Sequence, residues 1–187
     1  MTPVGRTPDV EFILLNFADG TVGIMQFVLD DHRIVRQEAT DENVQAQIKR
    51  SPFSQPVNNW RRMDQSEIPA DRTFRNAWVD GGTTVAVDMP KARDLHRDRI
   101  RSDRALLFSQ LDVAYARADE AGDTEAKAAI AAQKQALRDA PAHPDIEAAQ
   151  TPEDLLAARP PALDQPVNGA ADGGTARYKG GLGIVKG

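Results

Sequence analysis

The sequence contains no cysteine, which excludes disulfides, zinc–thiolate sites and thiol nucleophiles. Aromatic residues make up only 5% of the chain. The longest apolar run, FILL, is far shorter than the roughly 20 residues that a membrane-spanning helix needs. The first residues, MTPVGRTPDVEF, lack the apolar stretch of a signal peptide. We therefore expect a protein that is made and used without export and that has no membrane contact.

Motifs for catalysis and metal binding are also missing. The three histidines, His32, His96 and His143, have no metal-ligand spacing, and the sequence contains no HExxH, GxSxG or GxxxxGK[ST]. The net charge of −5, with acidic and basic residues mixed, does not predict the basic surface of a nucleic-acid-binding protein. We therefore expect no enzyme activity, no cofactor, no metal and no nucleic-acid partner.

The N-terminal part of the chain favours short β-structure. After a Pro/Gly-containing arm at residues 1–8, VEFILLNF and TVGIMQFVL flank the turn signal Asp19-Gly20, a pattern typical of a β-hairpin. DENVQAQIKR, preceded by Thr40 as N-cap, predicts a short helix. Residues 51–72 contain three prolines and are expected to be a loop. TFRNAWV and TTVAVDM, joined by DGG, predict a second hairpin.

From Asp88 onward the pattern becomes helical. Leu107, Leu111, Ala114 and Ala118 form an apolar stripe in a helix of about thirty residues that ends at Gly122, and TEAKAAIAAQKQALRDA predicts a second, shorter helix. The short connection requires the two helices to pack antiparallel. The difference in length is expected to leave half of the long helix for another surface to cover. TPEDLLAA predicts a last short helix, with Thr151 as its cap.

Two arginine-rich stretches have alternative interpretations. RDLHRDRIRSDR (93–104) holds five arginines with three aspartates among them, which favours a solvated, self-paired helix surface over phosphate binding. IPADRTFRNAW (68–78) is either an internal anchor or a docking site for a partner protein, since such sites are enriched in aromatic residues and arginine. In an extended strand, Phe74, Asn76 and Trp78 would share one side and would fasten the second hairpin to the long helix, with Trp60 joining them.

The run PADRTFRNAW…DGGTTVAVDMPKARDLHRDRIR…LDVAYARADEAGD…KQALRDAP…TPEDL resembles small tail-associated proteins of tailed bacteriophages and prophages, of the tail-fibre or tail-assembly type. The resemblance covers roughly residues 9–157. It implies a structural protein of the tail, in its adaptor, tip or fibre-attachment region. Such a protein would be made in the host cytoplasm, would reside in the virion, and would bind other tail proteins and copies of itself without catalysis.

Two other functions remain as alternatives. The helical hairpin ending in LRD also resembles tail-fibre assembly chaperones, which would shield a client's apolar surface with the uncovered stripe of the long helix and would be absent from the mature particle. The Gly-rich tail after residue 165 is not expected of such chaperones. The second alternative is a peptidoglycan hydrolase, which tail tips often carry, although no catalytic constellation supports it.

The predicted fold is α+β, with three regions. Residues 1–87 form a β-rich region with a short helix, residues 88–158 form the helical hairpin and the terminal helix, and residues 159–187 form a Pro/Gly-rich extended arm. The arm has too few apolar residues to order itself, so we expect a neighbouring subunit to hold it. The predicted protein-interaction residues are Trp60, Arg72, Phe74, Arg75, Trp78, Arg177, Tyr178, Leu182, Ile184 and Val185.

Overall fold

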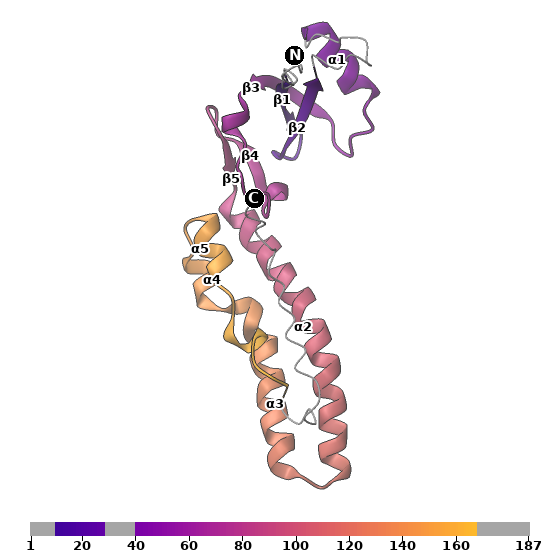
Figure 1. The fold of residues 1–187 in the computed structure, drawn as a ribbon, viewed down its shortest axis with the longest axis vertical. Helices are drawn as coiled ribbons and strands as arrows, with labels where there is room; N and C mark the ends of the chain where they lie inside the picture. Colours follow the sequence, from indigo (N-terminus) through magenta and orange to yellow (C-terminus); the bar gives the residue numbers. More distant parts are fainter. Residues whose placement is uncertain (1–9, 29–39, 168–187) are drawn as a thin grey trace, which may run out of the picture. The chain divides into compact units, whose positions relative to one another are not determined.

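The computed structural model describes residues 10–28 and 40–167, and its fold is mixed α+β as predicted, with small antiparallel sheets followed by helices (Figure 1). The chain divides into two compact units, unit 1 (Met1–Leu95) and unit 2 (His96–Gly187). The boundary falls inside the long helix, whereas the predicted division came between residues 87 and 88. The predicted arms at residues 1–8 and beyond residue 167 lie outside the described residues.

Unit 1 is built on a three-stranded antiparallel sheet in the order β2-β1-β3. Strands β1 (Val10–Phe17) and β2 (Val22–Val28) form the predicted first hairpin. Gly20 closes its turn at φ +79°, a backbone conformation that glycine adopts without steric cost. Strand β3 (Val57–Met63) lies in the segment for which a loop was predicted, so that prediction was wrong.

Both faces of this sheet carry buried apolar clusters. Successive side chains of a strand point to opposite faces, so the apolar residues of β1 contribute to both clusters. Phe12 and Leu14 face one cluster of buried residues, which also includes Val22, Met63, Trp78 and Val85. Ile13 and Leu15 face the other, which also includes Phe27 and Val44. Val44 comes from the predicted helix α1 (Asp41–Arg50), whose cap Thr40 accepts a hydrogen bond from the Asn43 N–H at 3.3 Å.

The second hairpin is shorter than predicted. Its strands β4 (Trp78–Asp80) and β5 (Val85–Val87) have three residues each, and a 3₁₀ turn at Arg75–Ala77 replaces the expected start of the first strand. Residues three apart lie on one side of such a turn. Phe74 and Ala77 are accordingly both buried, while Arg75 and Asn76 are exposed. The expected sharing of one side by Phe74, Asn76 and Trp78 was therefore wrong.

Unit 2 contains most of the predicted helical hairpin. Helix α2 (Met89–Glu120) begins after Asp88, whose carboxylate accepts the Lys91 N–H at 3.1 Å, and α3 (Thr124–Asp139) begins after the cap Asp123. Between them Gly122 has a φ of +68°, as a helix stop requires. Ion pairs join Asp112 with Lys134 at 2.6 Å and Asp119 with Lys127, so the two helices run antiparallel (Figure 1).

Within unit 2, residues 96–103 of α2 contact the segment that follows α3. Helices α4 (Pro144–Ala148) and α5 (Pro152–Ala157) turn back along α2. His96 Nε2 donates to the Ala158 carbonyl at 3.2 Å, and Arg159 pairs with Asp103 at 3.3 Å. Residues 96–103, in the half of the helix that was expected to need another surface, thus contact the segment 144–159. Helix α5 has the predicted cap Thr151, whereas α4 was not predicted.

The first residues of the predicted C-terminal arm pack on unit 2. Pro160, Ala162 and Leu163 are buried in and beside a 3₁₀ turn (Pro161–Leu163), and Gln133 of α3 donates to the Pro166 carbonyl at 2.8 Å. Across residues 10–28 and 40–167, no helix combines the length and apolarity needed to cross a membrane.

Candidate protein-interaction surfaces

The structure places the five predicted residues of the IPADRTFRNAW region in different surroundings. Phe74 and Trp78 are buried, with 2% and 6% of their surface exposed. Trp78, the first residue of β4, packs in a cluster with side chains of the three-stranded sheet, with Val85 of β5 and with Ile68. Arg72 and Arg75 are exposed. These positions favour an internal anchor for Trp78, while partner binding by the two arginines stays a prediction.

Trp60 does not join Trp78, which corrects the sequence-based expectation. It pairs with Leu15 across β1 and β3 and packs on the face covered by α1, opposite the face of Trp78. The Arg62 guanidinium lies 5.6 Å from its ring centroid and also pairs with Asp41 of α1 at 2.8 Å. Trp60 is therefore a half-buried support for α1 on a different face from Trp78, and partner binding by Trp60 stays a prediction.

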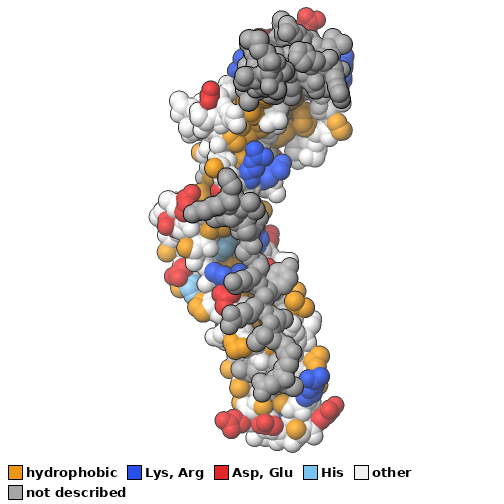
Figure 2. Space-filling model, viewed as in Figure 1, with side chains coloured by type: hydrophobic (Ala, Val, Ile, Leu, Met, Phe, Trp, Pro, Cys, Tyr) orange, Lys and Arg blue, Asp and Glu red, His pale blue; other side chains and the backbone are white. Residues whose placement is uncertain are grey.

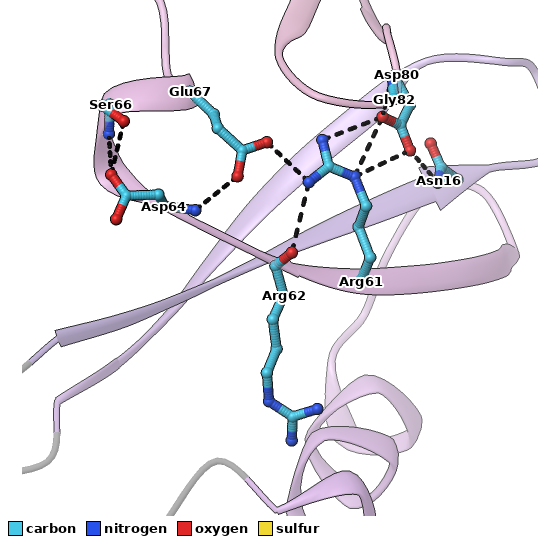
Figure 3. A network of polar contacts seen from close by, with 8 residues as sticks. All are labelled: Asn16, Arg61, Arg62, Asp64, Ser66, Glu67, Asp80 and Gly82. Atoms are coloured by element: carbon cyan, nitrogen blue, oxygen red, sulfur yellow. Dashed lines mark hydrogen bonds and ion pairs between the residues drawn. The ribbon is translucent and has the colours of Figure 1, made fainter.

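A polar network fastens the second hairpin to β3 (Figure 3). Arg61 Nη1 donates to Glu67 at 2.7 Å, and Arg61 Nη2 donates to Asp80 at 3.1 Å. Asp80 also accepts from Asn16 at 3.1 Å and from the Gly82 N–H at 2.9 Å. One guanidinium thus holds two carboxylates from two different elements, and the sequence contained no signal for this cluster.

The electrostatics of this network favour a structural role. Burial alone would raise the pKa of the Asp80 carboxyl, but hydrogen bonds from Arg61, Asn16 and the Gly82 N–H outweigh it and lower that pKa. The Asp64 N–H and Arg61 lower the pKa of the Glu67 carboxyl. Hydrogen bonds to Asp80 and Glu67 raise the pKa of Arg61. All three groups are therefore held in their charged forms near neutral pH, which suits a clamp better than proton transfer.

The arginine-rich stretch of α2 is only partly the self-paired surface that was predicted. Asp98 and Arg101 form the expected i,i+3 pair at 2.6 Å. Arg97, however, pairs with Glu147 of α4, and Arg104 Nη1 donates to the carbonyls of Leu137 and Arg138, each at 3.0 Å. These contacts direct Arg104 toward the C-terminal end of α3 and Arg97 toward α4.

The result is a groove of about 430 Å³ in unit 2, here called the arginine groove. It is lined by Arg97, Arg101, Arg104, Arg138, Pro141, Ala142, His143 and Glu147. Sequence reasoning missed it. The available signal was the i, i+4, i+7 spacing of Arg97, Arg101 and Arg104, which places all three on one helix face.

A second surface feature is apolar. Leu106 and Val113 of α2 are 58% and 53% exposed, the highest values among the large apolar side chains of the described residues. Seven residues separate them, so they lie on nearly the same side of the helix, about 10 Å apart. We call this pair the α2 ridge. Tyr115, also partly exposed, lies beneath the ammonium groups of Lys127 and Lys134 at 5.6 and 5.0 Å.

The remaining predicted residues, Arg177, Tyr178, Leu182, Ile184 and Val185, lie outside the described part of the chain. Within residues 10–28 and 40–167, no group of three or more His, Asp or Glu side chains is arranged to hold a metal ion. No protein-family model matches this sequence, and no curated protein or solved structure matches it either.

Proposed function

We propose that the chain is a structural protein of a bacteriophage tail, in the adaptor, tip or fibre-attachment region. It acts by binding other tail proteins and copies of itself. Support for the biological setting comes from the resemblance of the DRTFRNAW box and the following VDMPKAR helix to tail-associated proteins. Support for protein binding comes from the geometry of unit 2.

The observation that carries the protein-binding part is the α2 ridge. Leu106 and Val113 are more than half exposed on a helix whose opposite side buries Leu111, Ala114 and Ala118. Because about half of each side chain is still exposed, covering the rest of both would stabilise a complex by about 1.5–3 kcal/mol. A micromolar complex needs about 8 kcal/mol. The ridge therefore serves as the centre of a larger contact, such as those between subunits of an assembly.

Copy number per particle, measured by quantitative mass spectrometry of purified virions, tests this function. We expect a fixed count near about 3, 6 or 12, because closed tail symmetries favour such multiplicities. Absence of the chain from particles, together with abundance in infected cells, would overturn the proposal in favour of an assembly chaperone.

The same measurement on variants tests the ridge. The double variant Leu106→Ser/Val113→Ser should fold normally, because exposed substitutions change stability by only about 0.5 kcal/mol each, but should be depleted from particles. Leu156→Ser is the matched control, since Leu156 is an exposed leucine of α5 in the same unit, with 40% of its surface accessible. Equal incorporation of the double variant and the control would remove the ridge from the interface.

A further inference from the structure

We propose that the arginine groove binds an acidic peptide segment of a partner protein. The inference rests on the proposed function in one respect, namely that the chain works by protein binding. It adds a second surface, separate from the α2 ridge, and a chemical class of partner. The groove is formed within unit 2, from the α2 residues Arg97, Arg101 and Arg104 and from the segment 138–147.

The lining of the groove is predominantly positive. Four guanidinium groups and one carboxylate, that of Glu147, line the groove. Arg104 donates to two backbone carbonyls and Arg138 to the side-chain carbonyl of Gln135 at 3.2 Å, so the hydrogen-bond acceptors of both are neutral. Their positive charges therefore remain available to an anion. Several like charges around one hollow also raise its local potential and attract negatively charged groups.

Two of the guanidinium groups are already held in place. Those of Arg104 and Arg138 lie 5.8 and 6.0 Å from the ring centroid of Phe108, so one aromatic ring holds both by cation–π attraction. Hydrogen bonds to the end of α3 fix Arg104 further. Side chains that are ordered before binding lose less conformational entropy when a ligand arrives. Preorganisation of this kind distinguishes the groove from a set of flexible surface arginines.

One arginine of the groove, Arg97, already binds a carboxylate, that of Glu147. This residue projects from α4, and its carboxylate forms an ion pair with Arg97 in the groove although 66% of its side chain is exposed. The groove thus already contains one carboxylate bound by one of its arginines. The planar guanidinium fork matches carboxylate geometry. Arg97 and Arg104 are seven residues apart, about 10 Å along the helix, which corresponds to about three residues of extended peptide.

The surroundings disfavour nucleic acid. The chain carries a net charge of −5, and Asp98 pairs with Arg101 at the groove. On the face shown in Figure 2, acidic and basic side chains are interspersed over unit 2, and acidic ones gather at the turn between α2 and α3. A nucleic acid needs a continuous basic surface that displaces many counterions. A short acidic segment needs only the groove.

Fluorescence anisotropy with a labelled hexaglutamate peptide and the full chain tests the inference. We expect saturable binding at low salt that weakens at about 0.3 M salt, where charges are screened over a few ångströms. Arg138→Glu should weaken binding at least about tenfold, while Arg117→Glu should leave it within about twofold, because Arg117 lies on α2 outside the groove. Both variants change the net charge equally.

Glu147→Gln provides a gain-of-binding variant. It removes the one carboxylate that lines the groove, so hexaglutamate should bind up to about fivefold more tightly, the equivalent of one exposed ion pair. Circular dichroism confirms that each variant is folded before the titration. A merely structural role of the Arg97–Glu147 pair would instead predict unchanged or weaker binding.

Three results would overturn the inference: an equal loss of affinity in Arg138→Glu and Arg117→Glu, binding of inorganic phosphate without hexaglutamate, or tighter binding of a hexathymidine oligonucleotide than of hexaglutamate. The proposed tail function and the groove assignment can be contradicted independently of each other. If the chain is absent from particles while Arg138→Glu still loses hexaglutamate binding, the tail assignment is wrong and the groove stands. If the chain is present at a fixed copy number but hexaglutamate does not bind, the groove assignment alone is wrong.

Discussion

At the scale of single residues, His96 is the most informative side chain of unit 2. It is 8% exposed on α2, and its Nε2 donates to the Ala158 carbonyl beyond α5. Burial lowers the pKa of the imidazole, and the nearby Arg99 and Arg159 lower it further. The hydrogen bond to Ala158 and the charge of Asp103 act in the opposite direction. The net result is a neutral histidine at the point where α2 meets the C-terminal segment.

This arrangement predicts that acid destabilises unit 2. The folded-state pKa of His96 lies below its unfolded value of about 6.5, so the unfolded chain binds more protons in the window beneath that value. The stability that depends on neutral His96 is therefore complete above about pH 6.5 and is lost as the pH falls through the folded pKa. Thermal unfolding followed by circular dichroism at pH 8, 6 and 5 should show a smaller decrease for His96→Gln than for the wild type. An identical pH dependence in both proteins would contradict the role of His96.

At the scale of secondary-structure elements, the second hairpin depends on Trp78. Strands of three residues form few backbone hydrogen bonds and are not stable alone. Trp78 supplies the large apolar contact with the sheet, and the Arg61–Asp80 ion pair adds a polar one. The Ala77 carbonyl also accepts the Asp88 N–H at 2.8 Å, directly before α2 begins.

Trp78→Ala is therefore expected to destabilise unit 1 by about 3–5 kcal/mol, as large-to-small core substitutions do. Trp78→Phe should cost much less, because the indole Nε1 has no hydrogen-bond partner among the described residues and its removal leaves no new unsatisfied group. Arg75→Ala, at an exposed position of the same segment, should change the stability by less than about 0.5 kcal/mol. Urea unfolding measures all three. A cost for Arg75→Ala as large as that for Trp78→Ala would contradict the anchor interpretation.

At this scale, the elements that formed as predicted are those with strong local signals. Thr40 and Thr151 as caps, Asp19-Gly20 as a turn and Gly122 as a helix stop were all predicted, because each acts on neighbouring residues. Strand β3 was missed for a tertiary reason. Its apolar residues Val57 and Trp60 are three apart, not two, and share a face because the register shifts opposite Asn16 and Phe17. That irregularity exists only when β3 is paired with β1.

At the scale of the whole molecule, the chain contains two compact units, and a different spectroscopic signal follows the unfolding of each. Both tryptophans, Trp60 and Trp78, lie in unit 1, whereas most helical residues lie in unit 2. Tryptophan fluorescence therefore follows the unfolding of unit 1, and circular dichroism at the helical band mainly follows that of unit 2. Two-state behaviour is not expected of a chain with two separate cores.

Ile130→Ala tests whether the units unfold independently. Ile130 is fully buried in α3, so the substitution should destabilise unit 2 by about 2–5 kcal/mol. We expect the midpoint measured by circular dichroism to fall while the fluorescence midpoint stays unchanged. Ala129→Gly, at an exposed neighbouring position, separates the effect of helix propensity, about 1 kcal/mol, from that of the core. Equal shifts of both midpoints in Ile130→Ala would mean that the two units unfold as one.

The sequence by itself determined the α+β class, the first hairpin, the boundaries of α1, α2 and α5 and the antiparallel helical hairpin, because turns, caps and apolar periodicity act over a few residues. The tertiary structure alone decided which residues meet from distant segments. It brought Arg138 and Glu147 to the arginines of α2, separated Trp60 from Trp78 on opposite faces of one sheet, and placed Ala158 and Arg159 against His96 and Asp103 of α2. Such contacts depend on how elements pack and on which side chains the packing buries, and no local pattern encodes either.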